Sequence, residues 1–356
     1  MTEYFLDILC NPHRLADLDP AAQGQILRQA HGAGLLGYLE ARTEEGSVSG
    51  KLADHLLSAR IISTFYDTQI KWEVRCLEQV LGVMDGPVVL LKGAAYKVLD
   101  LMLAQGRLAS DVDLLLPREQ LPSAESLLIA HGWEHLKEDE YEQHYYREWM
   151  HELPPLRHKE RGTIVDLHHN ILPPTARYKP DASKLRAAAV PIPGSPLFTL
   201  SPEDTLLHRC AHLFVDGDLD NALRELLDVR GLLQAYRDDE AFWRNLYPRA
   251  EELDLVMPLH HAVYFSNKLL EWNVPAHWQK SYQQLRDRAG GLRTALTLEM
   301  MENQLVPPDP ASKGLNRAIS GWILFLRSHW LRMPPLLLTR HLLTQAWRRG
   351  GLKTGG

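Results

Sequence analysis

Two aspartates stand one residue apart in an otherwise apolar run, a spacing that suits the binding of a divalent cation. In "DVDLLLP", Asp111 and Asp113 would point to the same side of a strand, because alternate residues of a strand share a face. Two carboxylates this close repel each other, and a bound cation removes that penalty. Mg²⁺ prefers oxygen ligands and usually takes one or two carboxylates together with substrate phosphates.

A third carboxylate, Asp166, lies in the apolar segment "TIVDLHHNI", which we expect to form another strand beside the first. Three carboxylates on adjacent strands are the arrangement that a two-metal site needs, with the ions roughly 4 Å apart on the attacking and leaving oxygens. The sequence therefore predicts that Asp111, Asp113 and Asp166 are both the metal ligands and the catalytic residues.

The turn before this strand has the features of a phosphate site. Gly93 has no Cβ, so backbone amides there can approach an anion closely, and a following helix would direct its N-terminal amides to the same place. Lys92 adds a positive charge. Arg107 would either contact a triphosphate or pair with one of the two aspartates, and Ser110 would either bond phosphate or simply start the strand.

A small α/β unit is needed to position these residues, and 83–172 has the corresponding pattern. The predicted elements alternate between strand and helix: a strand at 87–91, a helix of about three turns at 94–104, a strand at 111–117 and a helix at 118–133 that ends at Gly132. Alternating or aromatic stretches follow, and the turn "KERGT" between the last two indicates a hairpin. The expected sheet is mixed or mostly antiparallel.

Helical patterns flank this unit on both sides, which makes the predicted fold α+β. Residues 1–82 place apolar side chains at three- and four-residue intervals. Proline and glycine are frequent in 173–200, which is predicted to be a connector. Residues 201–356 are again helical in pattern, and Ser201 is a good N-cap for a helix that begins with Pro202.

The overall composition is that of an ordinary globular protein. Of the 356 residues, 45% are hydrophobic and 24% are charged, and the net charge of −6 excludes a protein that binds nucleic acid through a generally basic surface. The three cysteines, Cys10, Cys76 and Cys210, are too far apart for a disulfide framework or a zinc motif. A reducing cytoplasm is therefore the expected location.

The C-terminal part has the opposite charge. From Arg317 onwards there are seven basic residues, no acidic ones, and tryptophans at 322, 330 and 347. This basic tail would rest on an anionic membrane surface, meet nucleic acid or an acidic partner, or form helices packed on the acidic body with solvated charges. Its apolar segments are too interrupted for a membrane span.

The order of these motifs resembles the polymerase β-like nucleotidyltransferase superfamily, whose signature is a Gly-Gly or Gly-Ser turn, then Asp-x-Asp and a later third Asp. More closely, "LLKGAAY…GRLASDVDLLLP" and "VDLHHNI", with "SPEDTLLHRCAHLF" downstream, resemble an uncharacterised bacterial nucleotidyltransferase family with a "KG…R…D-hydrophobic-D" core. The resemblance extends from the helical N-terminal region to about residue 235. It implies a small mixed or antiparallel nucleotidyltransferase sheet.

The resemblance also assigns the site residues. It gives the turn to Gly93, the metal ligands to the three aspartates, and the basic positions of the family to Lys92 and Arg107. Ala94 stands where the wider superfamily has Gly or Ser, so a hydroxyl contact to phosphate is missing.

The activity implied is transfer of a nucleoside monophosphate from an NTP, with ATP expected, to an acceptor, with release of pyrophosphate. Mg²⁺ or Mn²⁺ would be the cofactor, and Asp166 would help to deprotonate the acceptor. The acidic body disfavours a long nucleic acid as acceptor, so a small molecule or a protein is expected. Two alternatives stay open: a nucleotide-binding or regulatory module without turnover, and a helical scaffold that binds partners.

Two histidines follow the third aspartate. Alternation places His168 on the Asp166 face, where it would lie near substrate or be a packed, hydrogen-bonded histidine, and it directs His169 away.

Further downstream, Asp204, His208 and His212 share one face of the predicted helix, which suits either packing or a metal site. Arg224 and Asp228 are four residues apart on the next helix and would form an ion pair.

Overall fold

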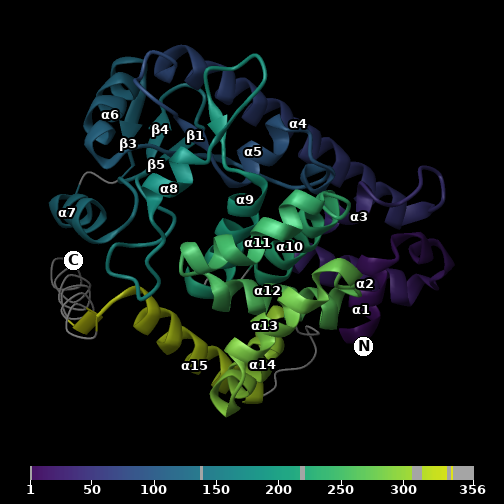
Figure 1. Ribbon diagram of the computed structural model, residues 1–356. Coiled ribbons are helices and arrows are strands. Elements are labelled where there is room, and N and C mark those ends of the chain that lie inside the picture. Colours follow the sequence, from purple (N-terminus) through teal and green to yellow (C-terminus); the bar gives the residue numbers. More distant parts are fainter. Residues whose placement is uncertain (1, 137–138, 217–220, 307–314, 335–337, 340–356) are drawn as a thin grey trace, which may run out of the picture.

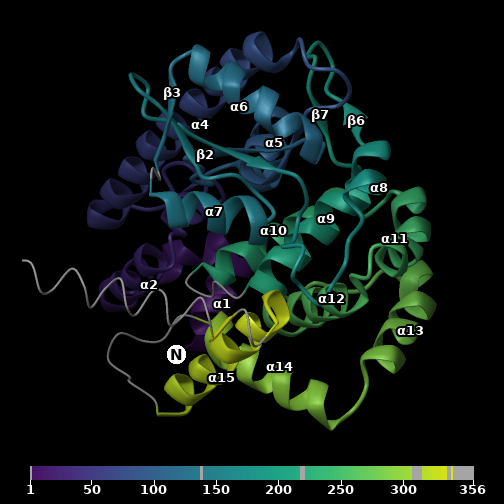
Figure 2. The ribbon, with the colours of Figure 1, turned by 90° about the vertical axis from the view of Figure 1, so that its left-hand side faces the viewer.

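The computed structural model describes residues 2–136, 139–216, 221–306, 315–334 and 338–339. The strands lie in the upper part of Figures 1 and 2 with helices around them, and the lower part consists of helices. The predicted α+β class, a mixed sheet with helical regions on both sides, is confirmed.

A mixed sheet forms the centre of the upper part. The described residues contain seven strands: β1 (Val89–Leu90), β2 (Asp111–Leu115), β3 (Trp133–His135), β4 (Leu156–His158), β5 (Ile164–His168), β6 (Val190–Pro191) and β7 (Phe198–Thr199). Their order across the sheet is β3-β4-β5-β2-β1-β7-β6. The middle strand is β2. It runs parallel to its neighbour β5 and antiparallel to its other neighbour, β1.

The two strands that carry the aspartates are buried because their remaining residues are apolar. Val112, Leu114 and Val165 have no exposed surface. Near-continuous apolar runs of this kind are typical of strands whose two faces are both covered. In the parallel register Asp113 pairs with Asp166, so the two carboxylates lie side by side on one face. The predicted hairpin is β4 and β5, which pair antiparallel around "KERGT".

Three helices pack against this sheet: α4 (Gly50–Leu81), α5 (Lys92–Val98) and α6 (Leu121–Ala130). A fourth, α7 (Glu140–Trp149), lies beside α6, where Arg147 pairs with Glu125. The end of α6 is as predicted, with Gly132 just beyond it at φ 100°.

Helix α5 is shorter than the three turns predicted for it. The chain turns at Asp100, which has φ 48°, and the Leu101 N–H donates to the Tyr96 carbonyl at 3.0 Å. Such a left-handed residue with a bond back over it ends a helix.

The aromatic stretch before the hairpin forms α7. Asp139 caps its start by accepting hydrogen bonds from the N–H groups of Tyr141 and Glu142. Aromatic side chains four residues apart then meet on one face, with ring centroids 6.5 Å apart for Tyr141 and Tyr145 and 5.8 Å for Tyr145 and Trp149. The cap and this row of rings explain why the stretch is helical.

The segment predicted to be a connector contributes to the sheet. It contains α8 (Ala182–Ala187), the edge strand β6 and the strand β7, which lies between β6 and β1 and runs parallel to β1. Proline and glycine are thus concentrated here at the turns between short elements, while the segment also extends the sheet beyond β1.

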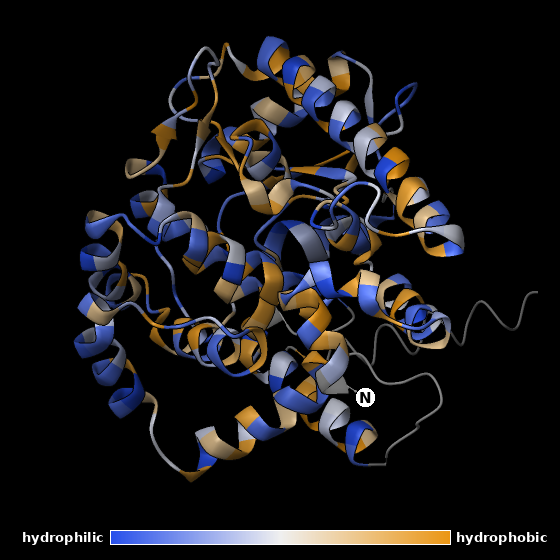
Figure 3. Ribbon diagram, turned by 90° about the vertical axis from the view of Figure 1, so that its right-hand side faces the viewer, coloured by the Kyte–Doolittle hydropathy of each residue, from blue (hydrophilic) through white to orange (hydrophobic). Residues whose placement is uncertain are grey.

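Helices make up the remainder of the described chain. The N-terminal ones are α1 (Thr2–Cys10), α2 (Pro20–Gly32) and α3 (Leu36–Glu40), and the C-terminal ones are α9 (Pro202–Ala211), α10 (Ala222–Ala235), α11 (Glu240–Glu252), α12 (Val256–Leu270), α13 (Gln279–Ala289), α14 (Leu292–Leu305) and α15 (Leu315–Arg332). The predicted start of α9 is confirmed, because the Ser201 hydroxyl accepts from the Asp204 N–H at 3.2 Å. Figure 3 shows hydrophilic and hydrophobic residues on the same helices, as expected of amphipathic helices packed on a core.

Half of the basic tail, including Trp347, lies outside the described residues. Trp322 and Trp330 belong to α15 and are exposed. Among the helices that the structure describes, none is both long and apolar enough to cross a membrane.

Candidate active site

The three aspartates meet at the middle of the sheet. β2 carries Asp111 and Asp113 on one face, and the neighbouring parallel strand places Asp166 directly beside Asp113. Their ligand oxygens all lie within 4.8 Å of one another. Asp111 is exposed, Asp166 is half-buried and Asp113 is buried, so the cluster extends from solvent into the protein. Oxygen ligands of this kind, open on one side, fit Mg²⁺ or Mn²⁺.

Asp113 is held by two positively charged or protonatable neighbours. Its Oδ1 accepts from the Lys92 ammonium at 2.8 Å and lies 2.9 Å from Nε2 of His168. Burial alone would raise the pKa of Asp113, but these two neighbours outweigh it and hold that pKa well below its usual range. One oxygen of Asp113 is thus fixed by protein groups, which leaves Oδ2 for a cation.

Asp166 has no such partners. Its Oδ1 is buried without a hydrogen-bond partner in the structure. Burial first, and then the negative charge of Asp113, raise the pKa of Asp166 to about 7. A buried carboxylate oxygen without a partner is costly, and a bound cation would remove that cost. The residues present therefore fit a divalent cation.

Lys92 and Gly93 were predicted to form a turn before a helix, but they are the first two residues of α5, and both contact protein groups. Lys92 has φ 47°, and this left-handed backbone directs its ammonium to Asp113. Gly93 is buried under Arg107: a Cβ at this position would lie 2.3 Å from Nη1 of Arg107 and 3.0 Å from Cβ of Ala109. A side chain at this position would require Arg107 and Ala109 to shift.

Substitution of Gly93 by alanine is therefore expected to destabilise the fold by about 1–3 kcal/mol, because the Arg107 side chain would have to move. Urea denaturation followed by circular dichroism measures this. Gly32→Ala is the control, because a Cβ there meets nothing within 4 Å. Equal stability of the two variants would show that Arg107 yields freely at this contact.

Arg107 pairs with Asp228 of α10 instead of with Asp111 or Asp113. Its Nε lies 3.0 Å from Oδ2 of Asp228, and both side chains are more than nine-tenths buried. Arg209 of α9 lies 3.7 Å from the same carboxylate. The partners of Asp228 are thus these two arginines, not the predicted Arg224. This pair ties the segment before β2 to the helical region.

His168 is a buried, hydrogen-bonded histidine next to the carboxylates, the second of the two roles expected of it. Its Nδ1 lies 3.4 Å from Oε2 of Glu152, and its ring centroid is 5.2 Å from that of His151. Burial opposes its charge, but Glu152 and then Asp113 raise the pKa of His168. His169 points the other way, with its Nε2 3.2 Å from the Met150 carbonyl.

Glu152 and His151 were not identified from the sequence. They form a second group with His168 whose ligand atoms lie within 4.8 Å of one another. No sequence motif marks them. They come to the site because the chain before β4 pairs with the end of β5, where Glu152 forms an antiparallel bridge with His168.

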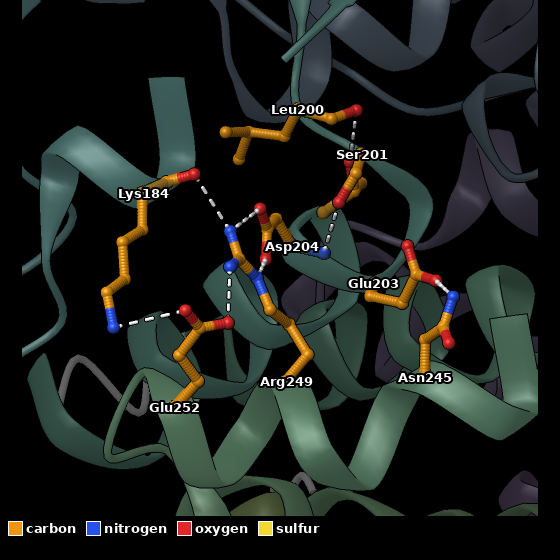
Figure 4. Close-up of polar contacts among 9 residues, drawn as sticks. Lys184, Leu200, Ser201, Glu203, Asp204, Asn245, Arg249 and Glu252 are labelled. Atoms are coloured by element: carbon orange, nitrogen blue, oxygen red, sulfur yellow. Dashed lines mark hydrogen bonds and ion pairs between the residues drawn. The ribbon is translucent and has the colours of Figure 1, made fainter. Parts of the chain in front are cut away.

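Asp204, His208 and His212 do not form a metal site with one another. Figure 4 shows Asp204 facing Arg249, whose Nε and Nη2 each lie 2.7 Å from a carboxylate oxygen. His212 bonds Glu225 at 3.0 Å. The groups that could hold a metal in the described part of the chain are the aspartates and the His151 group. Asp204 and His212 are instead engaged by Arg249 and Glu225, as the packing alternative for this face requires.

Asp111, Asp113 and Asp166 thus lie together on a mixed sheet next to Lys92 and Gly93, which is the arrangement expected from the resemblance to nucleotidyltransferases. Residues 19–271 match a family model described as "Uncharacterised nucleotidyltransferase". The match covers more than half of the chain, so the protein belongs to this family. A search of curated proteins and a search of solved structures found no match.

Proposed function

We propose that the protein transfers a nucleoside monophosphate from an NTP, with ATP as the expected donor, to an acceptor and releases pyrophosphate. The observation that supports this is the convergence of three carboxylates, one of which has a buried oxygen without a partner. Mg²⁺ or Mn²⁺ held by Asp111, Asp113 and Asp166 would neutralise phosphate charge and polarise the acceptor oxygen.

The three aspartates are proposed to have different roles, because they differ in burial and in hydrogen-bond partners. Asp113 is fixed by Lys92 and His168 and serves as the rigid ligand. Asp111 is exposed and faces the incoming substrate. Asp166 would take up the proton of the acceptor hydroxyl, since its oxygen is not engaged by a protein donor. The acceptor oxygen then bonds to the α-phosphorus as the bond from that phosphorus to pyrophosphate breaks.

The triphosphate is proposed to bind beside Lys92, Gly93 and Ser110, because Lys92 pairs with Asp113 and Ser110 directly precedes Asp111. Ser110 is also exposed. Arg107 would act mainly by packing on Gly93, since Asp228 already neutralises its charge.

Incubation with labelled ATP, GTP, CTP or UTP and Mg²⁺ or Mn²⁺ tests this function. We expect release of pyrophosphate that stops when EDTA removes the cation, because the carboxylates would then repel the phosphates. A cell extract searched for molecules that gain a nucleotide mass would identify the acceptor. Metal-dependent nucleotide binding without pyrophosphate would contradict the proposal and favour a regulatory module, and no nucleotide binding would favour a scaffold.

A further inference from the structure

A cavity lies away from the candidate active site, between α2, α3 and the first turn of α4. Its volume is about 740 Å³. Small-molecule sites are usually cavities of this size, with mostly apolar walls and a few placed polar groups. Figure 1 shows α2 and α3 at the right of the molecule and β5 at the left, so this cavity is separate from the three aspartates.

The charged groups around the cavity are all basic. Arg28, His31, Lys51 and His55 line it, and no acidic residue does. Within the described chain, none of these four side chains forms an ion pair or a side-chain hydrogen bond, although the protein as a whole carries a net charge of −6. A concave surface lined by one sign of charge focuses the electrostatic potential and attracts a ligand of the opposite sign.

The walls between these charges are apolar. Pro20, Leu27, Leu36 and Leu52 line the cavity, and Leu52 is buried. A small inorganic anion would leave these walls in contact with water, whereas an apolar group attached to the anion would cover them. The lining therefore combines a cationic rim with an apolar interior.

We propose that this cavity binds a phosphate monoester that carries an apolar body. Arg28 and Lys51 supply two permanent positive charges, which match the two negative charges of a phosphate monoester better than the single charge of a carboxylate. Arginine can also bond phosphate through two parallel N–H groups. The site is independent of nucleotidyl transfer, because none of its residues belongs to the aspartate cluster.

Isothermal titration calorimetry with n-octyl phosphate, below its micelle concentration, tests this site. The protein is expected to bind octyl phosphate more tightly than either inorganic phosphate or octanol. The double variant Arg28→Gln, Lys51→Gln should lose about tenfold or more in affinity, a change of about 1.4 kcal/mol. Both side chains are exposed, so the variant should fold.

The matched control is Lys159→Gln, Lys280→Gln, which removes the same charge at exposed positions outside the cavity. It should bind as the unaltered protein does, and so should Asp111→Asn. The proposal is overturned if octyl phosphate fails to bind, if octanol binds equally well, or if Arg28→Gln, Lys51→Gln retains full affinity. Loss of binding in Asp111→Asn alone would place the ligand at the aspartates and overturn it too.

Discussion

Replacement of Asp113 by asparagine is expected to lower nucleotidyl transfer by about 10³-fold or more. The amide keeps the shape of the side chain and can still accept from Lys92, but it removes the negative charge that holds a cation. Single-turnover release of labelled pyrophosphate at saturating NTP measures the effect on the chemical step. The change should appear in kcat, because the charge matters most as pyrophosphate leaves.

Asp85→Asn is the matched control for this experiment. Asp85 is exposed, precedes β1 and lies outside the carboxylate cluster. The nucleotidyl transfer activity of the Asp85→Asn variant should equal that of the unaltered protein. Full activity in Asp113→Asn, with turnover established for the unaltered protein, would mean that the carboxylates on β2 do not hold the cations.

Replacement of Lys92 by methionine should have the largest effect on stability. Methionine fills similar space but leaves the Asp113 carboxylate buried with His168 as its remaining partner. Breaking one side of a buried ion pair typically costs about 3–5 kcal/mol. Urea denaturation at pH 7 measures the loss in the free energy of unfolding, with the exposed Lys159→Met as control.

This loss should depend on pH in a defined direction. The pKa of Asp113 is held well below its usual range, with burial opposed and outweighed by Lys92 and His168. A carboxylate with a depressed pKa stabilises the fold above its unfolded-state pKa of about 3.9, and this stabilisation is lost as the pH falls below that value. The difference between Lys92→Met and the unaltered protein should therefore be smaller at pH 3.5 than at pH 7. A constant difference would show that Lys92 acts through packing alone.

The sequence predicted the elements whose signals are local. The apolar run around Val112, the cap at Ser201 and the stop at Gly132 each depend on a few neighbouring residues, and each is confirmed. The end of α5 was missed because an aspartate, not a glycine, takes the left-handed backbone at position 100. β7 was missed because two residues next to a proline-rich turn carry almost no pattern, and only the parallel pairing with β1 makes them a strand.

The site was predictable to the extent that alternation and strand pairing determine it. Alternation puts Asp111 and Asp113 on one face, and pairing of two apolar strands brings Asp166 to them. The contacts that fix the cluster were not predictable, since they join distant segments. Glu152 reaches His168 through an isolated bridge at the end of β5, and no spacing in the sequence encodes this contact.

The ion pair between Arg107 and Asp228 also limits how a substrate can enter. A hinge motion that moved the sheet away from α10 would separate Arg107 from Asp228. Each of these charged side chains, which are more than nine-tenths buried, would then lose its partner. Such separation typically costs several kcal/mol, so wide opening during each turnover is disfavoured. In the proposed reaction, both co-substrates should therefore arrive from the solvent side on which Asp111 is exposed, and the space there should limit the size of the acceptor.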